Sequence, residues 1–293
     1  MKEPGGSGKV FVSAGLAACA SEFATLPLDT AKVRLQLQSL SETYKPRKYR
    51  GVSHAMRLMV RQEGLGSLWN GLIPGLHRQA LFTTIRLGLY DTLKVHAAAE
   101  GGGGEATLGG RVSLAVLTSA LGIAAANPSD VLKVRCQAHG LRGGAMRNYR
   151  HIVSTEGLRG GLYKGFTANL IRNSVISASE IISYEQAKKT LIRVGGVADD
   201  WRLHLASGCI AGLVATVLGS PPDILATKAM QKQGRYGGLR ASEIAVKMVK
   251  TEGFLAFYKG FWPNFLRVGS FNITMWFLYE QMKRLMDEKV PRA

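Results

Sequence analysis

The pattern of hydrophobic and polar positions divides the chain into long apolar segments separated by basic, polar stretches. Residues 10–28 carry one charge, on Glu22, and residues 112–128 and 203–222 carry none. Each segment approaches the ~20 residues that a helix needs to cross a bilayer. All three are rich in Gly, Ala and Ser, which let membrane helices pack closely. The pattern therefore predicts an all-α membrane protein.

The same order of elements occurs three times: a long helix, a basic loop with a short amphipathic helix, and a second long helix. We expect these repeats at residues 7–99, 107–192 and 199–287, with the glycine run at 101–104 as a linker. The six transmembrane helices place both termini on one side of the membrane. The expected helices are 10–38, 54–62 and 74–95; 109–138, 147–155 and 167–191; and 201–233, 241–251 and 262–286.

A proline–acid–base motif ends the first long helix of each repeat. It begins at Pro27, recurs 101 residues later at Pro128, and recurs again 93 residues after that, at Pro221. Proline bends a helix, and charges at the end of an apolar helix need partners in lipid. Three copies suggest a ring in which each acid meets a base from a neighbouring repeat. Its members are Asp29, Lys32, Asp130, Lys133 and Asp223.

Two further motifs are also present in triplicate. One lies in the loop, as Glu63-Gly64 followed by Trp69-Asn70-Gly71, and recurs at residues 156–165 and 252–260. The other closes each repeat with an aromatic, an acid and, three residues later, a base on the same helix face. Three copies of the latter indicate a second ring instead of isolated surface pairs. It comprises Tyr90, Asp91, Lys94, Tyr184, Glu185, Lys188, Tyr279, Glu280 and Lys283.

The formal charge of +18 would by itself suggest a nucleic-acid partner. The basic residues lie mostly between the apolar segments, as in the loops of a membrane protein, so we expect no such partner. Cys19, Cys136 and Cys209 lack metal-ligand spacing, and the six histidines are scattered without the spacing of a catalytic site. The sequence therefore indicates neither an enzyme nor a metal site.

Together the triplicated motifs resemble those of the mitochondrial carrier family over essentially the whole chain. The resemblance implies a six-helix bundle with threefold pseudosymmetry around a central cavity, and three short helices on the matrix side. The proline–acid ring would form a matrix gate and the aromatic–acid ring a cytoplasmic gate, opening alternately in the inner mitochondrial membrane. Gln36 and Gln137 match the family's braces of the matrix gate. Structural cardiolipin, a monomeric state and termini facing the intermembrane space are further implications; no other cofactor is expected.

The third repeat departs from the family pattern. Ala226 occupies the position of the first base, and Met230 occupies the brace position. If the family pairing holds, Asp29–Lys133 and Asp223–Lys32 remain and Asp130 lacks its partner. The matrix gate would then be weaker, by ~1–3 kcal/mol for one partly buried pair, which favours opening toward the matrix.

Three arginines form the candidate substrate site. Arg78, Arg172 and Arg267 each lie 13 residues before the acid of the closing ring, or ~20 Å along a helix. At that depth an arginine faces water or a partner. Three guanidiniums would bind carboxylate, sulfate or phosphate with bidentate geometry. The alternative is that interhelical salt bridges hold them.

The resemblance gives this site a substrate class. The arginines match the family's contact points, with Gln79, Asn173 and Val268 as their neighbours, and the combination resembles carriers of keto and dicarboxylic acids. Residues 26–38, 126–137 and 260–283 resemble the uncoupling-protein branch. A regulated proton leak, with fatty acids and purine nucleotides as regulators, is therefore the second hypothesis. A carrier-like membrane scaffold that no longer transports is the third.

Two more acids break the threefold pattern. Glu22 lies two turns before Asp29 on the same face, and Ile123 and Thr216 stand at the equivalent positions. No partner for Glu22 is evident, so it is a candidate for carrying a proton beside an anion. Glu180 and Arg86 lie eight residues after Arg172 and Arg78. We expect them to pair across neighbouring helices, with a part in proton coupling as the alternative.

Overall fold

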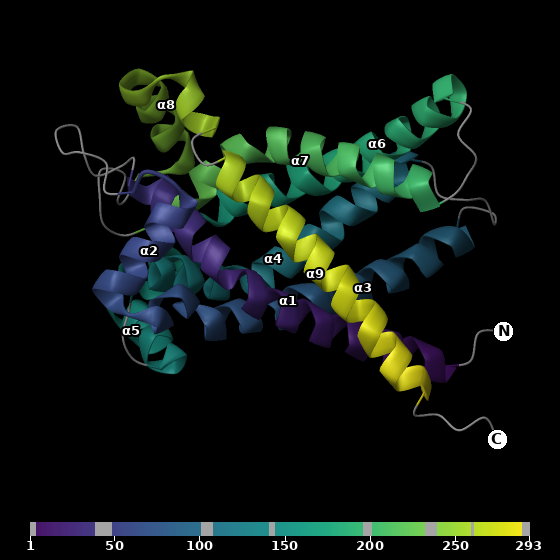
Figure 1. Cartoon of the computed structure of the whole chain (residues 1–293), viewed down its shortest axis with the longest axis horizontal. Helices are drawn as coiled ribbons and strands as arrows, with labels where there is room; N and C mark the ends of the chain where they lie inside the picture. The colour runs from purple at the N-terminus through teal and green to yellow at the C-terminus, as the bar shows by residue number, and fades with distance from the viewer. Residues whose placement is uncertain are drawn as a thin grey trace. The chain divides into compact units, whose positions relative to one another are not determined.

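The computed structural model describes residues 4–38, 49–100, 108–140, 144–195, 201–231, 239–258 and 261–288, and every regular element within them is helical. Long and short helices follow one another in the predicted order (Figure 1), which confirms the all-α fold. The long helices are α1 (Pro4–Gln38), α3 (Leu72–Glu100), α4 (Leu108–His139), α6 (Phe166–Gly195), α7 (Trp201–Ala229) and α9 (Phe261–Glu288). The short ones are α2 (Val52–Glu63), α5 (Ala145–Gly157) and α8 (Ala241–Glu252).

A single helical turn follows each short helix: η1 (Leu65–Trp69) and η3 (Phe254–Tyr258) are 3₁₀ turns, and η2 (Leu158–Leu162) is a wider π turn. The glycine at each junction adopts a positive φ, of 87° at Gly64, 74° at Gly157 and 78° at Gly253. Side chains rarely tolerate this conformation. The glycine of the second motif therefore provides the backbone conformation with which the chain leaves each short helix.

The helices α1, α4 and α7 continue through their prolines. Pro27 has no N–H to donate to the carbonyl of Phe23, one turn earlier. The indole N–H of Trp69 donates to that oxygen instead, at 3.1 Å. Trp69 therefore satisfies the carbonyl that the proline leaves free. Helix α7 ends at Ala229, four residues before the predicted end at 233. Just beyond this end, the backbone N–H of Gln231 donates to the carbonyl of Lys228, three residues earlier, instead of continuing the α-helical pattern.

Two hydrophobic clusters attach short helices to the ends of long ones. Ala55 and Met59 of α2 pack with Ala31 of α1 and Leu68 of η1. Ile152 of α5 packs in the same way with Leu132 and Cys136 of α4 and Leu162 of η2. In each case the apolar stripe of an amphipathic helix is the part that is buried.

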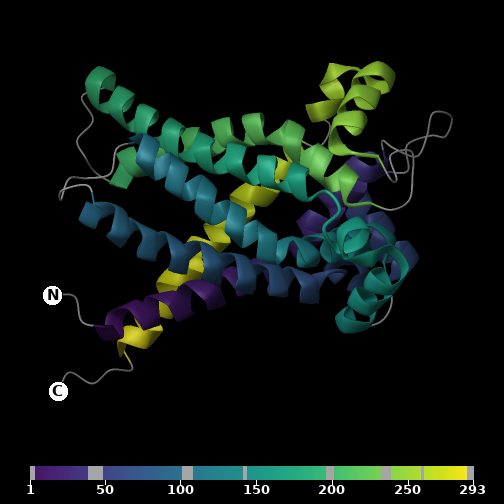
Figure 2. The same cartoon turned by 180° about the vertical axis from the view of Figure 1, so that it is seen from behind.

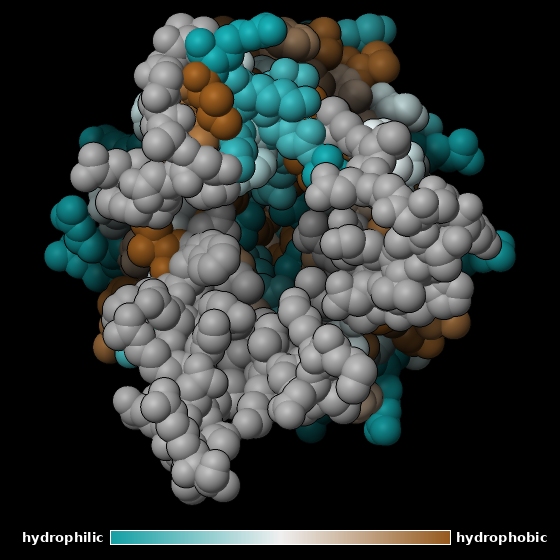
Figure 3. Space-filling model, turned by 90° about the vertical axis from the view of Figure 1, so that its right-hand side faces the viewer, coloured by the Kyte–Doolittle hydropathy of each residue, from teal (hydrophilic) through white to brown (hydrophobic). Residues whose placement is uncertain are grey.

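Within the described residues, two helices are long and apolar enough to cross a membrane by composition alone: Gly109–Ala138 and Ala206–Ala229. The parts of the other long helices whose side chains are described do not reach this combination of length and mean hydropathy. Several apolar side chains of the long helices are nevertheless exposed, such as Phe23, Leu117, Ile171 and Ile273. Figure 3 shows brown hydrophobic surface beside teal hydrophilic surface on one face. Exposed apolar side chains of this kind suit contact with lipid.

The chain divides into two compact units, which are described separately. Unit 1 comprises Met1–Thr83, Pro128–Tyr163 and Trp262–Ala293, and unit 2 comprises Thr84–Asn127 and Lys164–Phe261. In unit 1, the first turn of α1 and the last turn of α9 lie at the same end (Figures 1 and 2). In unit 2, α6 and α7 lie side by side in both views.

Candidate functional site

Each of the three candidate arginines forms an ion pair with an aspartate of the proline–acid motif. In unit 1, the Nε of Arg78 lies 2.6 Å from Asp130, and the Nε of Arg267 lies 3.3 Å from Asp29. In unit 2, the Nε of Arg172 lies 2.8 Å from Asp223. The alternative of arginines held in interhelical salt bridges therefore describes this structure.

The expectation that Asp130 lacks a partner is wrong. Ala226, whose side chain carries no charge, is buried, and the long side chain of Arg78 reaches Asp130 from α3 instead. A carboxylate buried without a partner would cost several kcal/mol. The loss of the base at position 226 therefore does not leave an uncompensated charge on Asp130.

Unit 1 concentrates two acids around one lysine. The Nζ of Lys133 lies 2.6 Å from Asp29 Oδ2 and 2.6 Å from Glu22 Oε1. The Asp29–Lys133 pair is the one that the family pattern predicts. Gln137 Nε2 donates to Asp29 Oδ2 at 3.0 Å, as expected of a brace. The expectation that Glu22 has no partner is wrong, because Lys133 forms an ion pair with Glu22 as well as with Asp29.

The approach of α3 to Glu22 depends on a glycine. A side chain at Gly75 would place its Cβ 2.9 Å from Glu22 Oε1, closer than real contacts allow. One turn later, Gln79 Nε2 donates to Glu22 at 3.5 Å, and Gln79 Oε1 accepts from Arg78 Nη1 at 3.4 Å. These long hydrogen bonds connect a candidate substrate arginine to Glu22.

Unit 2 contains a chain of three amides at the corresponding depth. Asn173 Nδ2 donates to the backbone oxygen of Asn169 at 2.8 Å and to its Oδ1 at 3.0 Å. Asn169 Nδ2 in turn donates to Asn127 Oδ1 at 3.3 Å. Asn127 and Asn169 are fully buried. Sequence reasoning missed both. For Asn169 a signal was present, because Asn264 stands at the same distance before Arg267 in the third repeat, whereas Asn127 occurs in one repeat only.

A second set that sequence reasoning missed connects the short helices to the long ones. Both terminal nitrogens of the Arg34 guanidinium, Nη1 and Nη2, donate to the carboxylate of Glu63. Those of Arg135 donate to the carboxylate of Glu156, at 2.7 and 2.9 Å. In the third repeat Lys228 lies 3.7 Å from Glu252. The signal was present: the last base of the first motif and the glutamate of the second both occur three times.

The Tyr149 side chain of α5 lies beside the start of the matrix-gate motif in α4. Its hydroxyl donates to Ser129 Oγ at 3.0 Å, and its ring stacks on that of His77 with centroids 6.3 Å apart. Burial raises the pKa of the Tyr149 phenol. The phenol therefore stays protonated at neutral pH and remains a donor.

Several predictions lie outside the described side chains, and they stay predictions. Glu185 is described and pairs with Arg111 at 2.9 Å, whereas most of the cytoplasmic ring is not. The Glu180–Arg86 and Asp223–Lys32 pairs and the brace role of Gln36 also stay predictions. The ring side chains not described are those of Tyr90, Asp91, Lys94, Tyr279, Glu280 and Lys283, and Arg86 joins them.

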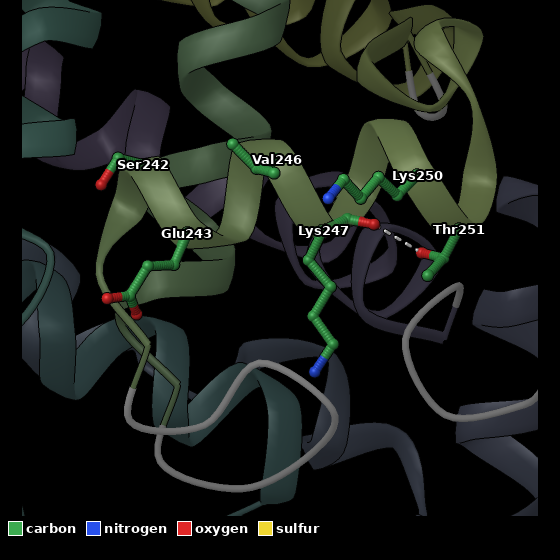
Figure 4. A pocket seen from close by; sticks show the side chains of 6 residues that line it. All are labelled: Ser242, Glu243, Val246, Lys247, Lys250 and Thr251. Carbon is green, nitrogen blue, oxygen red and sulfur yellow. Dashed lines mark hydrogen bonds between the residues drawn. The ribbon is translucent and has the colours of Figure 1, made fainter.

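A pocket of about 500 Å³ lies on α8 (Figure 4). Its lining includes Lys247, Lys250 and Val246, and Thr251 Oγ1 donates to the backbone oxygen of Lys247 at 2.8 Å. It contains none of the predicted site residues. Among the described residues, no group of three His, Cys, Asp or Glu side chains is placed to hold a metal ion.

Comparison with known proteins matches a family model described as "Mitochondrial carrier protein" at residues 4–100, 104–195 and 198–290. "Mitochondrial uncoupling protein 1" of Arabidopsis thaliana is 41% identical over 290 residues, covering 96% of this chain and 94% of that protein. "Dicarboxylate carrier UCP2" of Danio rerio is 41% identical over 288 residues, covering 94% and 91%. "Putative mitochondrial transporter UCP3" of Homo sapiens is 40% identical over 289 residues, covering 94% and 91%.

Proposed function

The chain belongs to the mitochondrial carrier family of inner-membrane transporters, and we propose that it moves small anions by alternating access. Dicarboxylates and keto acids are the first candidates, followed by sulfate and phosphate. Transport would proceed by exchange or together with a proton. Arg78, Arg172 and Arg267, with Gln79, Asn173 and Val268 beside them, would bind the substrate.

The observation that carries this proposal is the pairing of each arginine with a carboxylate of the matrix-gate motif. A guanidinium that holds an aspartate has the geometry and charge to hold a substrate carboxylate. An entering carboxylate would compete with Asp130 for Arg78, or with Asp223 for Arg172. Because one carboxylate replaces another, the arginine stays paired, while the displaced aspartate gives up one cationic partner. Binding of substrate would therefore weaken the contact between the helices that the ion pair joins.

Glu22 is the candidate for proton coupling. It is buried, shares Lys133 with Asp29, and hydrogen-bonds to the neighbour of Arg78. A proton on Glu22 would cancel its charge and leave Lys133 to Asp29 alone. Protonation would therefore alter the charge balance beside an arginine that holds substrate.

Regulated proton leak is the second candidate function. The buried acid Glu22 favours it, as does the 41% identity to a protein named "Mitochondrial uncoupling protein 1". Fatty acids and purine nucleotides would then be regulators. A non-transporting scaffold is less well supported, because all three arginines are present and engage carboxylates. Bound cardiolipin, a monomeric state and termini in the intermembrane space complete the proposal.

The test is uptake of labelled malate into liposomes that contain the purified protein, with and without internal anion. We expect uptake that requires internal malate, oxoglutarate, sulfate or phosphate and that falls to background in Arg172→Ala. Arg159→Ala, at an exposed arginine of η2, is the matched control and should retain uptake. A proton flux that needs no counter-anion and responds to fatty acid would instead establish the proton leak.

A further inference from the structure

In unit 2, α6 runs antiparallel to the part of α4 that ends at Asn127. Two polar pairs define which residues of the two helices lie opposite each other. The hydroxyls of Ser119 and Ser177 lie 3.3 Å apart, and Asn127 pairs with Asn169 at 3.3 Å. Eight residues separate the two pairs on each helix, so the residues midway between them, Ile123 and Asn173, meet in the same register. Ile123 is buried and apolar. Asn173 therefore finds no polar partner directly opposite and turns toward Asn169, one turn away on its own helix.

The orientation of the Asn173 amide follows from its contacts. The backbone oxygen of Asn169 can only accept a hydrogen bond, so the Asn173 atom 2.8 Å from it is the NH₂ group. The same NH₂ group donates to Asn169 Oδ1, which leaves Asn169 Nδ2 to donate to Asn127 Oδ1. Asn127, through Asn169, thus supports the orientation of the Asn173 amide.

Both N–H groups of the Asn173 side chain are consequently used, and its oxygen is not. Among the described residues, no donor bonds to Asn173 Oδ1, and the side chain is partly exposed. Gln79, at the equivalent position of the first repeat, differs: its oxygen accepts from Arg78 and its nitrogen donates to Glu22. Asn173 therefore offers an acceptor immediately beside Arg172.

We infer that Asn127 and Asn169 are positioning residues that make Asn173 present an oxygen acceptor beside Arg172, and that this acceptor selects 2-hydroxy dicarboxylates over 2-oxo dicarboxylates. This inference rests on the proposed anion transport. A hydroxyl next to the carboxylate held by Arg172 can donate to Asn173 Oδ1. A carbonyl at the same carbon brings a second acceptor against it, and a methylene offers nothing.

One neutral hydrogen bond changes an equilibrium constant by roughly threefold to tenfold. We expect the hydroxy acid to bind about tenfold more tightly than the oxo acid, with the unsubstituted acid between them. The effect is small beside that of the arginines, so it concerns the choice among dicarboxylates and not whether they are transported.

The test is competition with labelled succinate exchange in liposomes by L-malate, oxaloacetate and unlabelled succinate, which share a four-carbon frame and differ at one carbon. The wild-type protein should show the order malate, succinate, oxaloacetate in apparent affinity. Equal affinities, or a preference for oxaloacetate, would overturn the inference while leaving anion transport established. If none of the three is exchanged, the inference fails together with the dicarboxylate part of the proposed function, and exchange of sulfate or phosphate then decides whether anion transport remains.

Two variants separate positioning from a structural role, with succinate as the internal reference for folding. Asn173→Leu removes the acceptor and should bring malate and oxaloacetate to within about twofold of each other. Asn127→Leu, which installs the residue found at the equivalent Leu26 of the first repeat, should reduce the malate preference partly. Ser177→Ala removes a polar pair between the same helices and should leave the preference unchanged. Loss of preference in Ser177→Ala, or full preference in Asn173→Leu, would contradict the inference.

Discussion

The helix pairs α1/α3 and α4/α6 occupy equivalent positions in the first two repeats, and they differ in the chemistry between the helices. In the first pair, Gly75 admits Glu22, and the acid hydrogen-bonds to Gln79 and shares Lys133. In the second, Ile123 replaces the acid, and Asn169 replaces the glycine. At the positions of Glu22 and Ile123 the first pair is charged and the second is neutral, although Arg111 and Glu185 form an ion pair elsewhere along α4 and α6. We call them the charged pair and the neutral pair on the basis of these positions.

This difference separates residues that the repeats have in common from residues that vary between repeats, and an asymmetric substrate needs both kinds. Both pairs share an arginine followed by an amide, and each arginine holds an aspartate of the next repeat. In the proposed function these residues serve the common step of binding and releasing a carboxylate. In the two proposals above, the residues that differ would respond to protons in one pair and to hydrogen-bond donors of the substrate in the other. We therefore propose that residues repeated in the threefold pattern form the gate, and that residues differing between the repeats determine selectivity.

The largest effect is expected where the two pairs agree. Arg78→Ala and Arg172→Ala each remove a candidate anion-binding group and take a cationic partner from a buried aspartate, which costs ~3–5 kcal/mol for a buried pair. Malate uptake should fall by at least about 100-fold in either variant. Measured initial rates at matched protein content decide this.

Arg78→Lys and Arg172→Lys keep the charge and lose the planar fork, so they should retain more uptake than the alanine variants. Alanine variants that transport at wild-type rates would remove the shared step from the account.

A smaller effect is expected at the glycine that distinguishes the first pair. In Gly75→Ala, the new Cβ would displace Glu22 Oε1, which Lys133 holds at 2.6 Å. Overpacking of this kind costs ~1–3 kcal/mol, from which a helix gain of up to ~1 kcal/mol for replacing glycine is subtracted. We expect a lower Tm in detergent.

Gly15→Ala on α1 is the matched control, because no atom lies within 4 Å of its added Cβ. It should leave the Tm unchanged or raise it. Equal behaviour of the two alanine variants would mean that Glu22 is not held tightly against α3.

The smallest effect is expected in the neutral pair. Ser177→Ala breaks one contact between two buried hydroxyls of α4 and α6, and an interhelical hydrogen bond in a membrane protein averages ~0.6 kcal/mol. The Tm should fall by a degree or two at most, without a change in transport rate. A fall as large as that of Gly75→Ala would show that the neutral pair depends on its polar contacts as strongly as the charged pair does.

The sequence predicted the fold well because the fold depends on features that occur three times. Apolar segments, prolines and glycines recur at fixed spacing, and the helices begin and end within a few residues of the expected positions for most elements. The Asp29–Lys133 pair and the Gln137 contact were expected from the resemblance to the mitochondrial carrier family.

The candidate site was predicted less well, because its partners depend on side-chain reach. Arg78 lies on a different helix from Asp130, and spacing along one helix contains no information about that contact. For the same reason Glu22 was expected to lack the lysine that it shares with Asp29. The amide chain depends on Asn127, which occurs in one repeat only, since Leu26 and Ser220 stand at the equivalent positions.

The most direct test of the account is the internal pH of liposomes recorded during malate uptake, for the wild-type protein and for Glu22→Gln. Glutamine keeps the size of the side chain and cannot carry the proton, and Lys133 keeps Asp29 as its partner. The account predicts that the wild-type protein moves protons with malate and that the variant takes up malate without a pH change. Equal proton movement in both proteins would contradict it, because the charged helix pair would then have no role that the neutral pair lacks.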